Sequence, residues 1–184
     1  MEYRYAGEGD VGQMAALFAA NRRDALTERQ RAEYGFVQGD FGAGALTGMV
    51  RERALLVADD SGRVAGLLGL CEPGALGEAS PAVVGLLEAQ GQLEWGGRAL
   101  GEVPWLLYGP VVVDVAYRGR GVARGLFRMA VAEAVGRAEV IVAFIEDGNL
   151  PSWKVHVEGF GMTPLGRYVV GGRGYRAVGA PVGG

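Results

Sequence analysis

The segment from Gly109 to Arg124 is the part of this sequence best suited to chemistry, because a glycine-containing turn joins an apolar strand to a helix there. The turn holds Gly119 and Gly121, and helical spacing begins at about Val122. The first N–H groups of a helix lack internal acceptors and lie at the positive end of the helix dipole, and glycines let an anion approach the backbone closely. The pattern therefore predicts an anion or phosphate site.

Two common nucleotide-binding motifs do not fit this turn. The dinucleotide-binding fingerprint G-x-G-x-x-G needs a third glycine, where this sequence has Arg124. A Walker A motif needs a lysine in the turn, and the only lysine of the chain is Lys154. An ordinary glycine-rich turn, or a loop that binds ATP or NAD without these motifs, stays open as an alternative.

The turn instead has the pattern Arg118-x-x-Gly121-x-Ala123, directly after the strand that ends near Val113. This pattern resembles the pyrophosphate loop [Q/R]-x-x-G-x-[G/A] of the GNAT superfamily, the acyl-CoA-dependent N-acyltransferases. The loop also lies at the expected junction, about two-thirds along a chain of suitable length. The resemblance implies that acetyl-CoA is the acyl donor.

The resemblance also assigns cofactor-binding positions on both sides of the turn. The backbone of the strand end would pair with the pantetheine arm and the acetyl carbonyl, and the Val113 N–H is the candidate donor to a developing oxyanion. Backbone N–H groups of the loop would hold the pyrophosphate. The implied cofactor-binding residues here are Val111, Val112, Val113, Arg118, Gly119, Arg120, Gly121, Val122, Ala123 and Arg124. Arginines at this spacing are also common on a plain solvated helix face.

A second block, Asn149-x-x-Ser152-x-x-x-His156, resembles the second cofactor motif of the same family, N-x-x-[A/S]-x-x-x-[Y/H]. The resemblance implies that Asn149 bonds the pantetheine arm, that Ser152 adds a contact, and that His156 is the general acid for the departing thiolate. The family usually has Gly-Phe four residues after this motif, whereas Gly159-Phe160 follows three residues after His156 and Gly161-Met162 five, so the loop is one residue shorter or one longer. Two plainer interpretations stay open: Asn149 as a helix N-cap, and His156 as a partly buried structural histidine.

Such an enzyme works by direct attack of a neutral amine on the thioester carbonyl. A base must first take a proton from the ammonium form of the acceptor. Asp114, Glu146 and Asp147 lie nearby in sequence, and water is a further option. Histidine suits the proton donor because its ordinary pKa of about 6.5 lies near working pH.

The elements that must position these residues follow from apolar patterning. Asp10 with Gln13 resembles a capping box that opens the first helix. Strands are expected at 1–6, 55–58, 64–71, 105–114, 140–145, 166–170 and 175–178, and helices at 11–23, 27–33, 44–52, 81–92, 122–137 and 152–158. The order predicts an α/β fold with a mixed, twisted sheet of about seven strands, split around a parallel pair formed by 105–114 and 140–145. We expect one N-acetyltransferase domain over residues 1–184.

Composition narrows the class of protein. A net charge of −3 disfavours non-specific nucleic-acid binding, which depends on phosphate neutralisation. One cysteine and one histidine exclude a Cys/His zinc site, and we expect no metal. The longest nearly apolar run, 103–113, is shorter than the roughly 18 residues a membrane helix needs. We therefore expect a cytoplasmic protein without membrane or nucleic-acid partners.

The sequence thus predicts transfer of an acetyl group from acetyl-CoA to a primary amine of a small molecule or peptide. A non-catalytic acyl-CoA-binding or sensor module is the alternative. The acceptor pocket would come from residues 24–50 and 73–104, where no motif identifies the acceptor. A homodimer is compatible with the family resemblance, and no sequence feature demonstrates it.

We expect acetyl-CoA and CoA to raise the melting temperature of the chain, while ATP and NAD at the same concentration leave it unchanged. A ligand at 100 times its dissociation constant adds about 2.7 kcal/mol of stability, which corresponds to several degrees for a domain of this size. Differential scanning fluorimetry checks this. A shift with ATP or NAD alone would contradict the proposed loop function.

Overall fold

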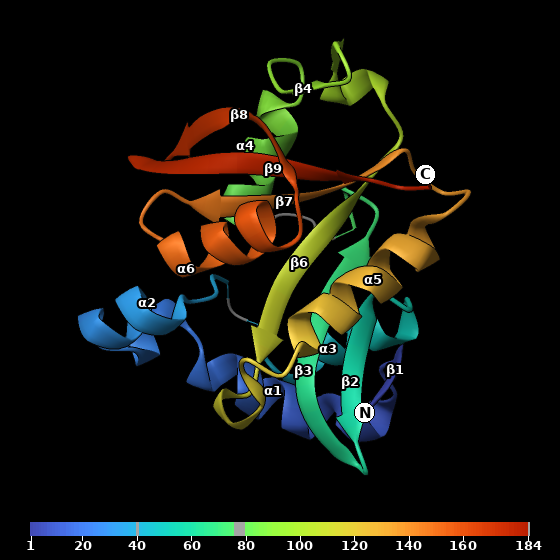
Figure 1. Ribbon diagram of the computed structural model, residues 1–184, viewed down its shortest axis with the longest axis vertical. Coiled ribbons are helices and arrows are strands. Elements are labelled where there is room, and N and C mark those ends of the chain that lie inside the picture. The colour runs from blue at the N-terminus through green and yellow to red at the C-terminus, as the bar shows by residue number, and fades with distance from the viewer. Residues whose placement is uncertain (40, 76–79, 184) are drawn as a thin grey trace. The chain divides into compact units, whose positions relative to one another are not determined.

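Seven strands form one mixed sheet in the order β1-β2-β3-β6-β7-β9-β8 (Figure 1). The computed structural model describes residues 1–39, 41–75 and 80–183. The strands are β1 (Glu2–Tyr5), β2 (Leu55–Asp60), β3 (Arg63–Cys71), β6 (Trp105–Val113), β7 (Val140–Glu146), β8 (Thr163–Val170) and β9 (Arg173–Pro181). The recorded registers are antiparallel except that of β6 and β7, which is parallel. The predicted mixed α/β sheet with its parallel pair is confirmed.

The helices largely match the expected segments. They are α1 (Val11–Ala20), α2 (Glu28–Tyr34), α3 (Ala43–Arg51), α4 (Pro81–Ala89), α5 (Val122–Ala134) and α6 (Leu150–Trp153). Helix α5 ends earlier than expected, and Gly136 follows with a φ of +76° that favours glycine. The segment 73–104 also contains a small hairpin, β4 (Glu94–Trp95) with β5 (Arg98–Ala99), that the sequence did not predict.

The chain forms two compact units. The first comprises residues 1–27, 36–70 and 108–130, and the second comprises residues 28–35, 71–107 and 131–184. Strand β6 passes from the second unit into the first between Leu107 and Tyr108. Each half of the predicted site therefore has its own structural support. That the whole chain acts as one N-acetyltransferase domain stays a prediction.

In the first unit, glycines bring helix α5 close to the strands that it crosses in Figure 1. A Cβ at Gly66 of β3 would lie 3.0 Å from the Val122 side chain, at the first turn of α5. A Cβ at Gly125 of the same helix would overlap the ring of Tyr3 in β1. Because no larger residue fits without displacing these neighbours, the start of α5 is fixed closely against β1 and β3.

In the second unit, β7 lies between β6 and β9, and its residues Val140, Ile141 and Val142 are fully buried. This agrees with the continuous apolar run that predicted a strand covered on both faces. Helix α4 packs against β8, where the Tyr168 hydroxyl donates to the Ala82 carbonyl at 2.9 Å. Strand β7 is thus firmly packed, and it directly precedes the segment that carries the second predicted motif.

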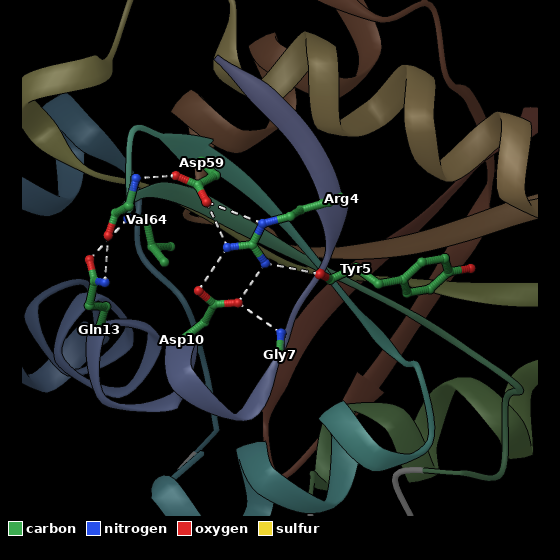
Figure 2. A network of polar contacts seen from close by, with 8 residues as sticks. Arg4, Tyr5, Gly7, Asp10, Gln13, Asp59 and Val64 are labelled. Atoms are coloured by element: carbon green, nitrogen blue, oxygen red, sulfur yellow. Dashed lines mark hydrogen bonds and ion pairs between the residues drawn. The ribbon is translucent and has the colours of Figure 1, made fainter.

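An arginine joins three separate segments of the first unit, as Figure 2 shows. The Arg4 guanidinium donates to both carboxylate oxygens of Asp10, at 2.7 and 2.9 Å, and to Asp59 Oδ2 at 2.7 Å. The Gly7 N–H donates to Asp10 Oδ2 at 2.7 Å. These charge-assisted bonds hold β1, the entry to α1 and the end of β2 together.

The predicted capping box at the start of α1 is not formed, although the helix does begin at Val11. The Asp10 carboxylate is engaged by Arg4 and Gly7 instead. Gln13 reaches the β2–β3 turn, where its Nε2 donates to the Gly62 carbonyl and its Oε1 accepts from the Val64 N–H, both at 3.0 Å (Figure 2). Both side chains of the predicted capping box therefore bond to other segments of the chain instead of to the start of the helix.

Arg4 lowers the pKa of both carboxylates that it contacts. Its hydrogen bonds are the largest cause at Asp10 and at Asp59, with further lowering by the N–H groups of Gly7 and Gly62. A carboxylate whose folded pKa is lowered contributes stability above its unfolded pKa of about 3.9. That contribution is lost as pH falls through the folded value, so the network weakens only in acid.

No helix of the described residues is long and apolar enough to span a membrane.

We expect Arg4→Met to lower the melting temperature at pH 7 by several degrees, because two carboxylates lose their shared partner. Arg51→Met is the matched control, since the Arg51–Glu8 pair is exposed at both side chains, 70% and 65%, and contributes little. Thermal melts from pH 7 down to pH 2.5 measure both variants. Equal effects of the two substitutions, or an Arg4 effect that persists undiminished at the lowest pH, would contradict this account.

Candidate functional site

The predicted pyrophosphate loop connects a 3-10 turn, Val115–Tyr117, to helix α5. Gly119 and Gly121 have φ values of +73° and +80°, in the region that only glycine adopts readily. Both residues are exposed, and a Cβ built at either would meet no atom within 4 Å. The glycines therefore shape the backbone and leave open space in front of it.

Several backbone N–H groups of this loop are available to an anion, although the Arg120 N–H already donates to the Tyr117 carbonyl at 3.4 Å. Within the described residues, no protein acceptor is recorded for the N–H of Gly119 or Gly121. Val122 and Ala123 open α5, so their N–H groups have no acceptor inside the helix. A row of donors at the positive end of a helix dipole fits a phosphate or pyrophosphate group.

The Arg118 side chain turns back into the protein. One guanidinium nitrogen donates to Asn21 Oδ1 at 2.7 Å, just after the end of α1. Nε donates to the Val113 carbonyl at 3.3 Å, at the end of β6. This side chain therefore joins the loop to the strand end, and the Arg118 N–H donates to the Val115 carbonyl at 3.4 Å. A contact of Arg118 with the pyrophosphate stays a prediction.

The end of β2 and the start of β3 support the other side of the loop. Asp114 pairs with Arg63 at 2.8 Å and also accepts from the Ala116 N–H at 2.9 Å. The Tyr117 hydroxyl donates to Asp60 Oδ2 at 2.9 Å. These contacts all lie within the first unit, so the turn is fixed before any ligand arrives.

The end of β6 departs from regular pairing. Its recorded register with β7 covers only Trp105, Leu106 and Leu107. Beyond these pairs Gly109 has a φ of +120°, and a Cβ at Gly69 of β3 would overlap the Gly109 carbonyl. Of the three predicted backbone contacts, Val112 is buried, whereas Val111 and Val113 are partly exposed.

In the second unit, Asn149 is the N-cap of α6. Its Oδ1 accepts from the Ser152 N–H at 3.4 Å, and the residue is 6% exposed. Gly35, which follows α2 with a φ of +72°, lies so close that a Cβ there would be 2.8 Å from Asn149 Oδ1. The capping interpretation is therefore correct for Oδ1. A bond from Asn149 to pantetheine stays a prediction.

His156 is held by the same short helix. It lies on a π-helical segment, Lys154–Gly159, and is 7% exposed. Its Nδ1 lies 2.8 Å from the Ser152 carbonyl oxygen and 3.3 Å from Ser152 Oγ. Burial lowers the pKa of His156, against a smaller raising effect of the Ser152 carbonyl. Asn149, Ser152 and His156 are thus brought together as one cluster.

Two of the three carboxylates considered as bases are engaged by arginines. Asp147 accepts from Arg167 at 2.6 Å and from Arg176 at 3.0 Å, and Arg167 is the main cause of its lowered pKa. Burial opposes ionisation of Asp114, but the Ala116 N–H and Arg63 together lower its pKa. Carboxylates held ionised by arginine are weak proton acceptors at neutral pH.

Two supporting residues were not identified from the sequence. Asn21 contacts Arg118, and Gly35 lies against Asn149, each across a long stretch of chain. Gly35 carries the ordinary signal of a helix end, which predicts a turn but no partner. Among the described residues, no group of three potential metal ligands comes together.

A family model described as the acetyltransferase (GNAT) family matches residues 23–162. Because the match covers well over half of the sequence, the chain belongs to the GNAT acetyltransferase family. It is an acyl-CoA-dependent acetyltransferase, and acetyl-CoA is its acyl donor. No curated protein matches the sequence.

Solved acetyltransferases share the fold over the full chain. A GNAT acetyltransferase from Streptococcus agalactiae superimposes with a TM-score of 0.68 at 12% identity, covering 100% of this chain and 96% of the other. A ribosomal-protein-alanine N-acetyltransferase from Brucella melitensis gives 0.64 at 17% identity, covering 98% and 99%. YncA from Salmonella typhimurium, solved with acetyl-CoA, gives 0.64 at 16% identity, covering 100% and 95%. At these identities the likeness establishes the fold.

The first unit fits the phosphate end of acetyl-CoA. The exposed glycines leave the loop backbone uncovered, since a Cβ built at Gly119 or Gly121 would meet no atom within 4 Å. Arg120 and Arg124 are exposed on this same turn and first helical turn. The loop has both the donors and the room that a pyrophosphate requires.

We expect Gly121→Ala to weaken CoA binding by about tenfold or more, because the loop backbone must leave its left-handed conformation or carry strain of about 1–2 kcal/mol. Gly136→Ala is the matched control: Gly136 has a similar φ of +76° and equally open surroundings, but lies beyond the other end of α5. Isothermal titration calorimetry with CoA measures both. The loop assignment fails if the two variants bind CoA as the unsubstituted chain does.

Proposed function

We propose that this chain is an N-acetyltransferase that transfers the acetyl group of acetyl-CoA to a primary amine of a small molecule or peptide. The observation that carries the proposal is the exposed glycine turn before α5, whose Gly119 and Gly121 have positive φ, in a chain of the acetyltransferase family. The turn supplies the anion site that an acyl-CoA donor needs.

Acetyl-CoA supplies an activated acetyl group when it is bound. The backbone from Gly119 to Arg124 binds the pyrophosphate, and the backbone from Val111 to Val113 orients the acyl end. The Val113 N–H polarises the carbonyl oxygen. Val111 and Val113 are partly exposed, in keeping with this role. Asn149 and Ser152 line the pantetheine arm in this proposal, and His156 handles the proton.

In this proposal the acceptor is an amine, because the neutral nitrogen of an amine is a nucleophile that can attack the thioester carbonyl directly. The segments 24–50 and 73–104, which we expect to form the acceptor pocket, contain no recognisable acceptor motif. Residues 40 and 76–79 of these segments lie outside the described residues. We propose a cytoplasmic site of action, where thiols stay reduced. The chain has one cysteine, so it cannot form an internal disulfide, which is consistent with that compartment.

Turnover of amines tests the proposal. The unsubstituted chain, acetyl-CoA and separate pools of polyamines, amino acids, aminoglycosides and peptide N-termini are combined, and free thiol release is followed. Mass spectrometry then identifies the acetylated product. We expect at least one pool to yield both CoA and an acetylated amine.

A second outcome separates enzyme from binding module. Tight CoA binding without acetylation of any amine would contradict the proposed function and favour a non-catalytic acyl-CoA module. Thiol release without an acetylated amine would identify hydrolysis instead. Gel filtration of the same preparation tests whether the chain forms the homodimer that the family resemblance allows.

A further inference from the structure

We infer that Arg167 and Arg176, two arginines of the β8–β9 hairpin, bind a carboxylate of the acceptor. The acceptor is then an amine that also carries a carboxylate, such as an amino acid, rather than a polyamine. The inference rests on the proposed function, to which it adds the chemical class of the acceptor. Every residue of this arginine site belongs to the second unit.

The two arginines lie side by side with one carboxylate between them. Arg167 and Arg176 are directly opposite each other in the antiparallel register, so their side chains share one face of the sheet. Like charges in such positions destabilise a strand pair, and Asp147, just after β7, is their counter-charge. Arg167 donates to Asp147 Oδ2 from Nε at 2.9 Å and from Nη2 at 2.6 Å, and Arg176 Nε donates to Oδ1 at 3.0 Å. The three side chains together keep one positive charge.

The hairpin is built to hold these groups in place. A Cβ at Gly174 would overlap both Asp147 Oδ2 and Arg167 Nη2, so the ion pair needs a glycine there. The Asp147 N–H donates to the Gly174 carbonyl at 3.0 Å. The Arg176 guanidinium lies 4.8 Å from the centre of the Trp153 ring in α6, which lies beside β9 in Figure 1. Backbone and ring contacts thus preorganise both arginines.

Both guanidinium groups are accessible to a ligand. The side chains of Arg167 and Arg176 are 61% and 42% exposed, whereas that of Asp147 is 29% exposed. A guanidinium has five N–H donors, and Arg176 gives only one of them to Asp147. Among the described residues, no protein acceptor is recorded for Nη1 or Nη2 of Arg176. Two such nitrogens form the fork that matches a carboxylate.

The nearest other carboxylate along β7 lies on the opposite face of the sheet. Glu146 pairs with Tyr175 in the β7–β9 register, whereas Arg176 pairs with Ile145, and side chains alternate between the two faces. Asp147 is already ionised, since Arg167 lowers its pKa. The remaining positive charge of the arginine site is therefore available to an anion from solution.

The position of the arginine site within the second unit points to the acceptor. Asp147 lies two residues before Asn149, and Trp153 directly follows Ser152. Asn149 and Ser152 line the pantetheine arm in the proposed function, and that arm carries the acetyl group. An amine that carries a carboxylate can place it on the two arginines, whereas a polyamine brings further positive charge and is repelled.

Matched acceptors give the first test. Amino acids and their carboxamides are compared as acceptors for the unsubstituted chain, with kcat/KM corrected for the fraction of neutral amine. We expect the best amino acid to exceed its amide by about tenfold or more, because the amide loses a charge-assisted hydrogen-bonded pair. Spermidine should be no better than the amides. Equal values for each acid and its amide, or a preference for spermidine, overturn the inference alone.

A substitution gives the second test. Arg176→Gln removes the fork and leaves Arg167 paired with Asp147, so KM for the best amino acid should rise about tenfold or more while kcat stays within about threefold. KM for its amide should not change. Arg98→Gln is the matched control, because Arg98 is 48% exposed and pairs with Glu139 elsewhere in the second unit. An unchanged KM in Arg176→Gln, or an equal rise for acid and amide, overturns the inference.

Binding of the product gives a test without turnover. N-acetylated amino acids carry the carboxylate but no reactive amine, and calorimetry in the presence of CoA compares them with their amides. We expect the acid of the best pair to bind about tenfold more tightly or better, and Arg176→Gln to abolish the difference. Equal binding of acid and amide overturns the inference. Weaker CoA binding by Arg176→Gln also overturns it, since the bound anion is then a phosphate of CoA. Absence of turnover with every amine overturns the proposed function, and the inference with it.

Discussion

The open N-terminus of α5 is the constraint on which the rest of the first unit depends. The first N–H groups of a helix that binds an anion must stay uncovered. The contacts that fix such a helix must therefore come from its other sides. Gly66 and Gly125 let the helix lie directly on the strands, and Arg118 ties the loop to β6. The exposed Gly119 and Gly121 complete the turn without side chains that would occupy the space.

The second cluster obeys a different constraint, since its polar groups are buried. Asn149 and His156 are among the few buried polar residues of the described chain, and both bond to the backbone of one short helix. Such bonds fix the direction of each side chain and, at His156, the tautomer. Burial of polar groups at this density is tolerated because each bond offsets desolvation. The first unit thus carries an open backbone donor row, and the second carries a buried side-chain cluster.

Local patterns predicted most elements because each carries its own signal. The apolar run at 140–145 indicated a strand buried on both faces, and the polar turn between two apolar runs indicated the β2–β3 hairpin. The β4–β5 hairpin was not predicted, because strands of two residues are too short to show an alternation of apolar and polar residues. The π-helix at Lys154–Gly159 escaped as well, although it falls where the Gly-Phe spacing departs from the family motif by one residue. A wider turn accommodates one more residue than an α-helical turn.

The loop motif could be predicted from the sequence because the backbone conformation of a glycine is a local property. The contacts of Asn21, Gly35 and Arg4 could not be predicted, because they join segments that are distant in the sequence.

The most direct test of the central claim is a titration of the nitrogen-15-labelled chain with CoA, followed by backbone amide NMR. The claim is that backbone N–H groups in the segment from Gly119 to Arg124 hold the pyrophosphate. The account predicts that these amides show the largest downfield shifts and gain protection from hydrogen exchange, and that 3′,5′-ADP, which lacks the pyrophosphate, reproduces the effect only weakly. Saturating CoA binding that leaves these amides unshifted would contradict it.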